Sequence, residues 1–154
     1  MPITTGPANL VKAQILVQLK ALITAGVLGS VIEQELTANV LKTDFPQYPC
    51  AVLGSSSMKS KWESQQTNVR TYQFDILIVQ NVDNLPASNP GYMEDLRDAM
   101  ATQFDNNFTL AGAALPGVQA VFSDKRQTTE NGKKFVTFMI SLQAKALANL
   151  TYSF

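Results

Sequence analysis

Residues 70–79 read RTYQFDILIV, and this stretch decides the fold because its side chains alternate in character along an extended chain. A strand that is buried on one side shows such a period of two. After Arg70, the even positions are large and apolar, whereas the odd positions begin polar and end with Leu77 and Val79. The two sets are Tyr72, Phe74, Ile76 and Ile78 against Thr71, Gln73 and Asp75.

A second long strand is predicted from about residue 133 to 144. Val136, Phe138 and Ile140 alternate there with Thr137, Met139 and Ser141. Asn131-Gly132 just before it is a hairpin signal, so residues 125–132 are predicted to form a turn after a strand at 118–124. Weaker patterns indicate short strands at 30–36 and 50–53 and a loop at 108–117.

Two helices are predicted from apolar residues spaced three and four apart. The first runs from an N-cap at Asn9 to a stop at Gly26. The second follows Pro90-Gly91 and ends near Asn106. Together the patterns predict an α+β fold, in which a mixed, mainly antiparallel β-sheet is packed on one face by two α-helices, with an extended hairpin or loop arm.

The chain of 154 residues is predicted to be one domain, residues 1–154, with a single core. The two periods place the following side chains inside: Leu10, Ile15, Leu19, Leu22, Phe74, Ile76, Ile78, Leu96, Met100, Phe104, Val136, Phe138 and Ile140.

Composition restricts the function classes. Lysine plus arginine and aspartate plus glutamate number 12 each, which argues against general nucleic-acid binding, because that needs a basic surface. No apolar run approaches the roughly 20 residues that cross a bilayer, and no signal-peptide pattern begins the chain. We therefore expect a soluble protein that does not associate with membranes.

The chain contains no histidine, the side chain best suited to proton exchange near neutral pH. It has no phosphate-binding glycine loop and no metal-ligand spacing, so neither catalysis nor a cofactor or metal is expected. Cys50 is the only cysteine and is predicted to be a small buried apolar residue. The carboxylate pairs Glu33/Glu35 and Glu94/Asp98 are interpreted as solvated surface.

Residues 55–68 (SSSMKSKWESQQTN) are predicted to form an exposed arm, either two-stranded or a mobile loop. Their only large apolar side chains, Met58 and Trp62, are too few to anchor so long a segment. Since tryptophan is common among interface anchors, Trp62 with Lys59, Lys61 and Glu63 is interpreted as a docking tip.

A polar but nearly uncharged sheet face is the second candidate interaction surface. Its composition is typical of a surface buried on assembly, and its residues are Thr71, Gln73, Thr137, Ser141 and Gln143. Asp75 lies on the same face and is expected to pair with a lysine or arginine across the strand or across an interface. Tyr152 and Phe154 are expected to dock the apolar C-terminal segment onto this subunit or a neighbour.

The order of these elements resembles that of phage tail terminator proteins. The resemblance covers roughly residues 9–144. It rests on the N-terminal helix, the FPQYPCAV run at 45–52, the polar excursion, RTYQFDILI at 70–78, a helix with LRDAM at 96–100, and the closing hairpin.

This resemblance implies a virion structural protein, assembled in the host cytoplasm, that forms a homo-oligomeric ring of six subunits. The ring would cap the head-proximal end of the tail tube and meet a neck or head-completion protein, with sheath protein as a further partner and DNA passing through its lumen. Another head–tail connector or head-completion protein is the first alternative. A small enzyme without histidine, or a ligand-binding domain, is the second.

Overall fold

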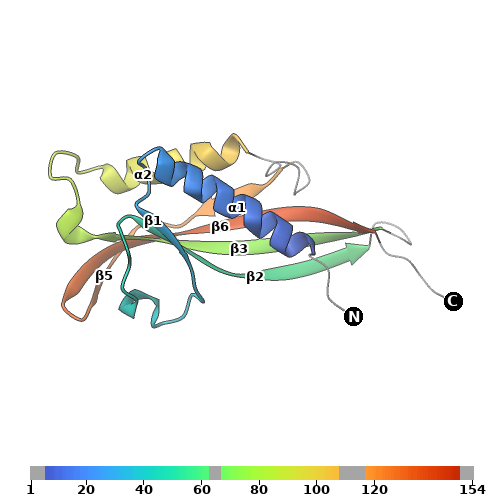
Figure 1. Ribbon diagram of the computed structural model, residues 1–154, viewed down its shortest axis with the longest axis horizontal. Coiled ribbons are helices and arrows are strands. Elements are labelled where there is room, and N and C mark those ends of the chain that lie inside the picture. The colour runs from blue at the N-terminus through green and yellow to red at the C-terminus, as the bar shows by residue number, and fades with distance from the viewer. Residues whose placement is uncertain (1–5, 63–66, 108–116, 150–154) are drawn as a thin grey trace.

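A six-stranded sheet forms one layer of the molecule, and two helices lie across one of its faces (Figure 1). The structure is a computed structural model that describes residues 6–62, 67–107 and 117–149. The strands are β1 (Ser30–Glu33), β2 (Cys50–Trp62), β3 (Thr67–Asn81), β4 (Gln119–Phe122), β5 (Arg126–Glu130) and β6 (Lys133–Asn149). The helices are α1 (Pro7–Thr24) and α2 (Tyr92–Asp105), with short 3-10 turns at Val40–Lys42 and Val82–Asn84.

The strand order is β1-β2-β3-β6-β4, and β5 also pairs with β6. Four of the five pairings are antiparallel, and only β1 and β2 run parallel. The predicted fold class is thereby confirmed: a mixed, mainly antiparallel sheet with both helices on one side.

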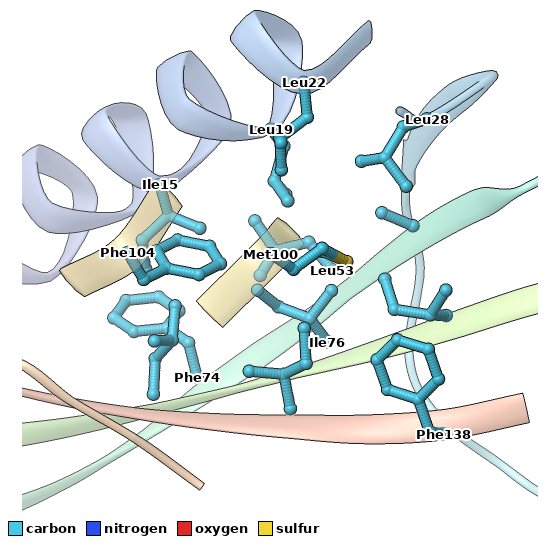
Figure 2. Packing of buried hydrophobic residues seen from close by; sticks show 14 of the residues in the cluster. Ile15, Leu19, Leu22, Leu28, Leu53, Phe74, Ile76, Met100, Phe104 and Phe138 are labelled. Carbon is cyan, nitrogen blue, oxygen red and sulfur yellow. The ribbon is translucent and has the colours of Figure 1, made fainter. Parts of the chain in front are cut away.

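Strands β3 and β6 are the central pair, because every residue of β3 has a partner in β6, from Thr67↔Asn149 to Asn81↔Phe135. The predicted alternation is confirmed. The even side chains of β3 from Tyr72 to Ile78 are at most 3% exposed and point toward the helices. Figure 2 shows Phe74 and Ile76 beneath side chains of α1 and α2.

A β-bulge in β2 changes which residues face the helices. Leu53 pairs with Ile76, but Ser56 pairs with Phe74, so β2 has one extra residue between these pairs. Before the bulge, Leu53 lies on the helix side of the sheet. After it, even-numbered residues such as Met58 take that side, because an inserted residue reverses the alternation.

Helix α1 begins and ends with recognisable local signals. It starts at Pro7 with Gly6 as N-cap, so the predicted cap at Asn9 is wrong; proline suits the first turn, where its missing N–H is not needed. The predicted stop at Gly26 is confirmed. Gly26 has φ +79° and its N–H donates to the Ile23 carbonyl at 3.0 Å, while the Val27 N–H donates to the Leu22 carbonyl at 2.9 Å.

The predicted core is confirmed at every position except Leu10, which is 52% exposed. Val11 is buried in its place, so the inward face of α1 differs from the predicted core only in its first turn. That face also carries Gln18, whose side-chain oxygen accepts a 2.6 Å hydrogen bond from Gln103 Nε2 on α2. This bond satisfies a buried amide and links the two helices. An ion pair of 3.4 Å between Lys12 and Glu33 links α1 to β1.

A smaller apolar cluster lies on the other side of the sheet, where residues 34–49 cover one end. Val40 and Phe45 pack there against Val52, Val79 and Phe135. Cys50 is fully buried in this cluster, and burial raises the pKa of its thiol, partly offset by a hydrogen bond with Ser30.

Two predicted boundaries are wrong at the closing hairpin. Residues 126–130, predicted as turn, form strand β5, and β6 continues to Asn149 rather than ending at 144. The Asn131-Gly132 turn is confirmed, since both residues have the positive φ that this tight turn requires (50° and 76°). The loop predicted at 108–117 lies outside the described residues, apart from Gly117.

The burial pattern of α1 predicts opposite outcomes for two leucines. Leu19→Ala removes a fully buried side chain and should lower the free energy of unfolding by about 2–5 kcal/mol. Leu10→Ala, the matched control on the outer face, should change it by less than about 1 kcal/mol. Urea unfolding of monomeric samples measures both, and equal losses would contradict the assignment.

Burial of Cys50 predicts a protected thiol. At pH 8 a thiol reagent should modify the folded protein at least about tenfold more slowly than the urea-unfolded chain. The raised pKa lowers the fraction of thiolate, and the surrounding side chains block access of the reagent. Rapid modification of the folded protein would contradict this expectation.

Candidate interaction surface on the open sheet face

The sheet face opposite the helices, here called the open face, is covered by residues 34–49 only at one end. The rest carries side chains aligned in rows by the strand register. Ser57, Gln73, Gln143 and Gln119 stand side by side across β2, β3, β6 and β4. Neighbouring strands lie about 4.8 Å apart, so this row spans about 14 Å.

The next row contains Asp75, Ser141 and Val121. Asp75 accepts hydrogen bonds from Ser141 Oγ at 2.8 Å and from Gln73 Nε2 at 3.2 Å, both to Oδ1. Among the described residues it has no lysine or arginine partner, so the predicted ion pair does not form within the subunit. The carboxylate is instead held by neutral donors on the open face, and Val121 beside it is 65% exposed.

The outer parts of three strands form an arm, defined as residues 55–62 of β2, 67–74 of β3 and 142–149 of β6. Its inner part, with Tyr72, Phe74 and Leu142, is still covered by the helices, and the ends of its strands extend past them (Figure 1). Strand β1 pairs only with residues 50–53 of β2, and β4 only with residues 140–143 of β6. Among the described strands, nothing pairs with either outer edge along most of the arm. The predicted exposed arm at 55–68 is therefore two-stranded where it is described, and β6 supports it as a third strand.

Lysines lie on the open side of this arm. Lys59 and Lys145 flank Thr71 in one row, and Lys61 follows in the next, beside Val69. All three lysines are exposed. Lysine on an unpaired strand edge discourages indiscriminate strand pairing, so these positions suit a controlled contact better than aggregation.

Most of the residues predicted for interaction come together here. Thr71, Gln73, Asp75, Ser141 and Gln143 share the open face, with Lys59 and Lys61 continuing along the arm.

Two predicted interaction residues are placed elsewhere. Thr137 is only 7% exposed, because it lies between Val79 and the β5 residue Arg126. Met58 is exposed but lies on the helix side, since the bulge reverses its facing. The side chain of Trp62 and all of Glu63, Tyr152 and Phe154 lie outside the described residues.

The prediction missed four residues of this surface: Ser57, Gln119, Val121 and Lys145. The sequence alternation assigns each to one of two faces, but only the pairing register shows that they are neighbours of Gln73 and Asp75.

Two hollows lie near β5. The larger, about 600 Å³, opens between residues 36–41 and 123–128, with Leu77 and Met139 among its lining residues. The smaller, about 350 Å³, includes Tyr92 and Arg126, and burial raises the pKa of Tyr92. Within the described ranges, no three cysteine, aspartate or glutamate side chains are grouped as a metal site.

Comparison with known protein-family models and with curated protein sequences gave no match. Neither helix in the described part of the chain has the length and apolar content needed to cross a membrane. The assignment of a role therefore depends on the chemistry of the surfaces.

The hydrogen bond between Ser141 and Asp75 makes a local prediction. Ser141→Ala should lower the free energy of unfolding by about 1 kcal/mol, because the partly buried carboxylate loses its shorter hydrogen bond. Gln143→Ala, two residues along the same face, should change it by less than about 0.5 kcal/mol, since Gln143 is exposed. If Ser141→Ala and Gln143→Ala lower the free energy of unfolding equally in chemical denaturation, the hydrogen bond adds nothing to stability.

Proposed function

We propose that this chain is a structural subunit of a homo-oligomeric ring, and that the ring is a phage tail terminator that caps the head-proximal end of the tail tube. The single observation that carries the assembly role is the open face. It combines amide and hydroxyl side chains in register across four strands, with Asp75 as the one carboxylate of its two central rows.

Such a surface suits burial against another protein. The core of a protein interface is depleted in charged residues, because each charge removed from water must be compensated. Glutamine side chains offer both donors and acceptors, so they can satisfy a partner's polar groups without a fixed charge. The exposed side chain of Val121 adds apolar area at the same place.

The arm supports the same role. Its two outer edges present backbone N–H and C=O groups with no described strand partner, and such edges accept a strand from another chain. The ends of its strands extend past the helices, which gives one subunit the reach to contact its neighbour (Figure 1).

The particular identity as a tail terminator is supported by the resemblance to phage tail terminator proteins in the order, length and polar–apolar pattern of the elements. It adds the proposed partners: five further copies, the tail tube protein, sheath protein in a contractile tail, and a neck protein, with DNA passing through the lumen. Another head–tail connector of the neck would use the same surfaces and is the second candidate.

The proposal is tested by native mass spectrometry and negative-stain imaging of the purified protein, alone and with isolated tail tubes. Rings that bind one end of the tubes are expected. Gln143→Glu, which adds a charge to the open face, should reduce the ring population at least about tenfold, whereas Gln127→Glu, an exposed glutamine on β5, should not.

A monomer under every condition, tubes included, would overturn the ring. Rings that do not bind tube ends but bind a neck protein would favour the connector alternative.

A further inference from the structure

Two surfaces of this neutral chain carry net charges of opposite sign. The arm, as defined above, carries Lys59, Lys61, Arg70 and Lys145 and no carboxylate. Glu63, which lies outside the described residues, still leaves this part of the chain net positive. Helix α2 has the opposite composition, with four carboxylates and one arginine.

The carboxylates of α2 form a stripe on its outer face. Asp95, Asp98 and Asp105 are exposed and recur at spacings of three and seven, which places them along one side of a helix. The inner side carries Met93, Leu96, Met100 and Phe104, all buried. The stripe is about 15 Å long, given a rise of about 1.5 Å per residue.

The nearby cations do not neutralise this stripe. Lys125 pairs with Glu94 at 2.6 Å, to one side of the stripe. Arg97 lines a small hollow with Glu94 and Lys125 rather than the outer face. Asp95 accepts a 3.0 Å hydrogen bond from Asn89, while Asp98 and Asp105 have no ion-pair partner among the described residues.

The basic and acidic surfaces do not meet within one subunit. Helix α2 lies on the helix side of the sheet (Figure 1), whereas the register places Lys59, Lys61 and Lys145 on the opposite, open side of the arm. Lys59 and Lys145 are separated by two strand spacings, about 10 Å, and fit within the length of the acidic stripe, about 15 Å. The two surfaces are therefore complementary in sign and comparable in extent.

We infer that the basic open side of the arm of one copy lies against the acidic outer face of α2 in the next copy. This inference rests on the proposed ring and names the contact that builds it. Because the two surfaces differ, the contact is head to tail, and such contacts close into a ring when the rotation between copies permits. Complementary charges also fix the register of the contact and accelerate encounter.

A charge-reversal experiment tests this contact. The arm variant is Lys59→Glu with Lys145→Glu, and the helix variant is Asp98→Lys with Asp105→Lys. All four side chains are exposed, so both variants should unfold at the wild-type midpoint. Each variant alone places like charges at the contact and should weaken assembly at least about tenfold.

Mixing the two variants should restore assembly to within about threefold of wild type, because the reversed arm meets the reversed helix and the native arm meets the native helix. Assembly is measured by sedimentation velocity at about 50 mM and 500 mM salt, and it should weaken at the higher salt. Lys20→Glu with Lys42→Glu changes the net charge as the arm variant does, at exposed sites outside the arm, and should assemble normally.

The outcomes separate this inference from the proposed ring. If both reversal variants assemble like wild type, the ring stands, the contact lies elsewhere, and the lysines only protect the strand edges. If the arm variant alone fails and mixing does not rescue it, the arm contacts something other than α2, and the inference is overturned. If the wild-type protein never assembles, both the inference and the ring are overturned.

Discussion

The structure depends on a change in burial along β3. Over residues 76–79 this strand is buried on both faces, whereas over residues 71–75 only its helix side is buried. The two-sided part requires a cover on each face, and α1, α2 and residues 34–49 provide it. The one-sided part needs a cover only on the helix side. Its other side stays open and continues onto the arm, so one strand supports both the core and the candidate interaction surface.

Stability and interaction are consequently assigned to opposite faces. The large apolar cluster between helices and sheet removes its side chains from water, and this burial is the main source of folding free energy. The rows on the open face take little part in that cluster. Substitutions there can alter association without unfolding the chain, which lets the two properties be measured separately.

Much of this fold could be predicted from sequence periodicity, because long strands and amphipathic helices have strong patterns. The central strand, α2 and the Asn131-Gly132 turn were predicted for this reason. Helix α1 was harder, since it has apolar residues on both sides: Leu10 and Val17 are each about half exposed, and packing selects the inner face. Strand β5 (RQTTE) was missed because it is polar and largely exposed, so its pairing with β6 decides its structure.

The candidate surface could be predicted only in part. Alternation assigned Gln73, Ser141 and Gln143 to one face, but it could not show that residues 34–49 and β5 enclose Thr137. Neither could it reveal the bulge that moves Met58 to the helix side. These outcomes depend on contacts between segments far apart in the chain. Periodicity within a single segment contains no information about them.

The uninterrupted pairing of β3 with β6 has a mechanical consequence. Their ladder runs from the core to the far part of the arm without a register shift, as the pairs Asn81↔Phe135 and Asn68↔Ala148 show. A force that pulls the arm along its length loads the hydrogen bonds of this ladder in shear. They then resist together rather than breaking one after another. The arm is therefore stiff and continuous with the core rather than hinged. Tension on its outer end is transmitted to the body of the subunit.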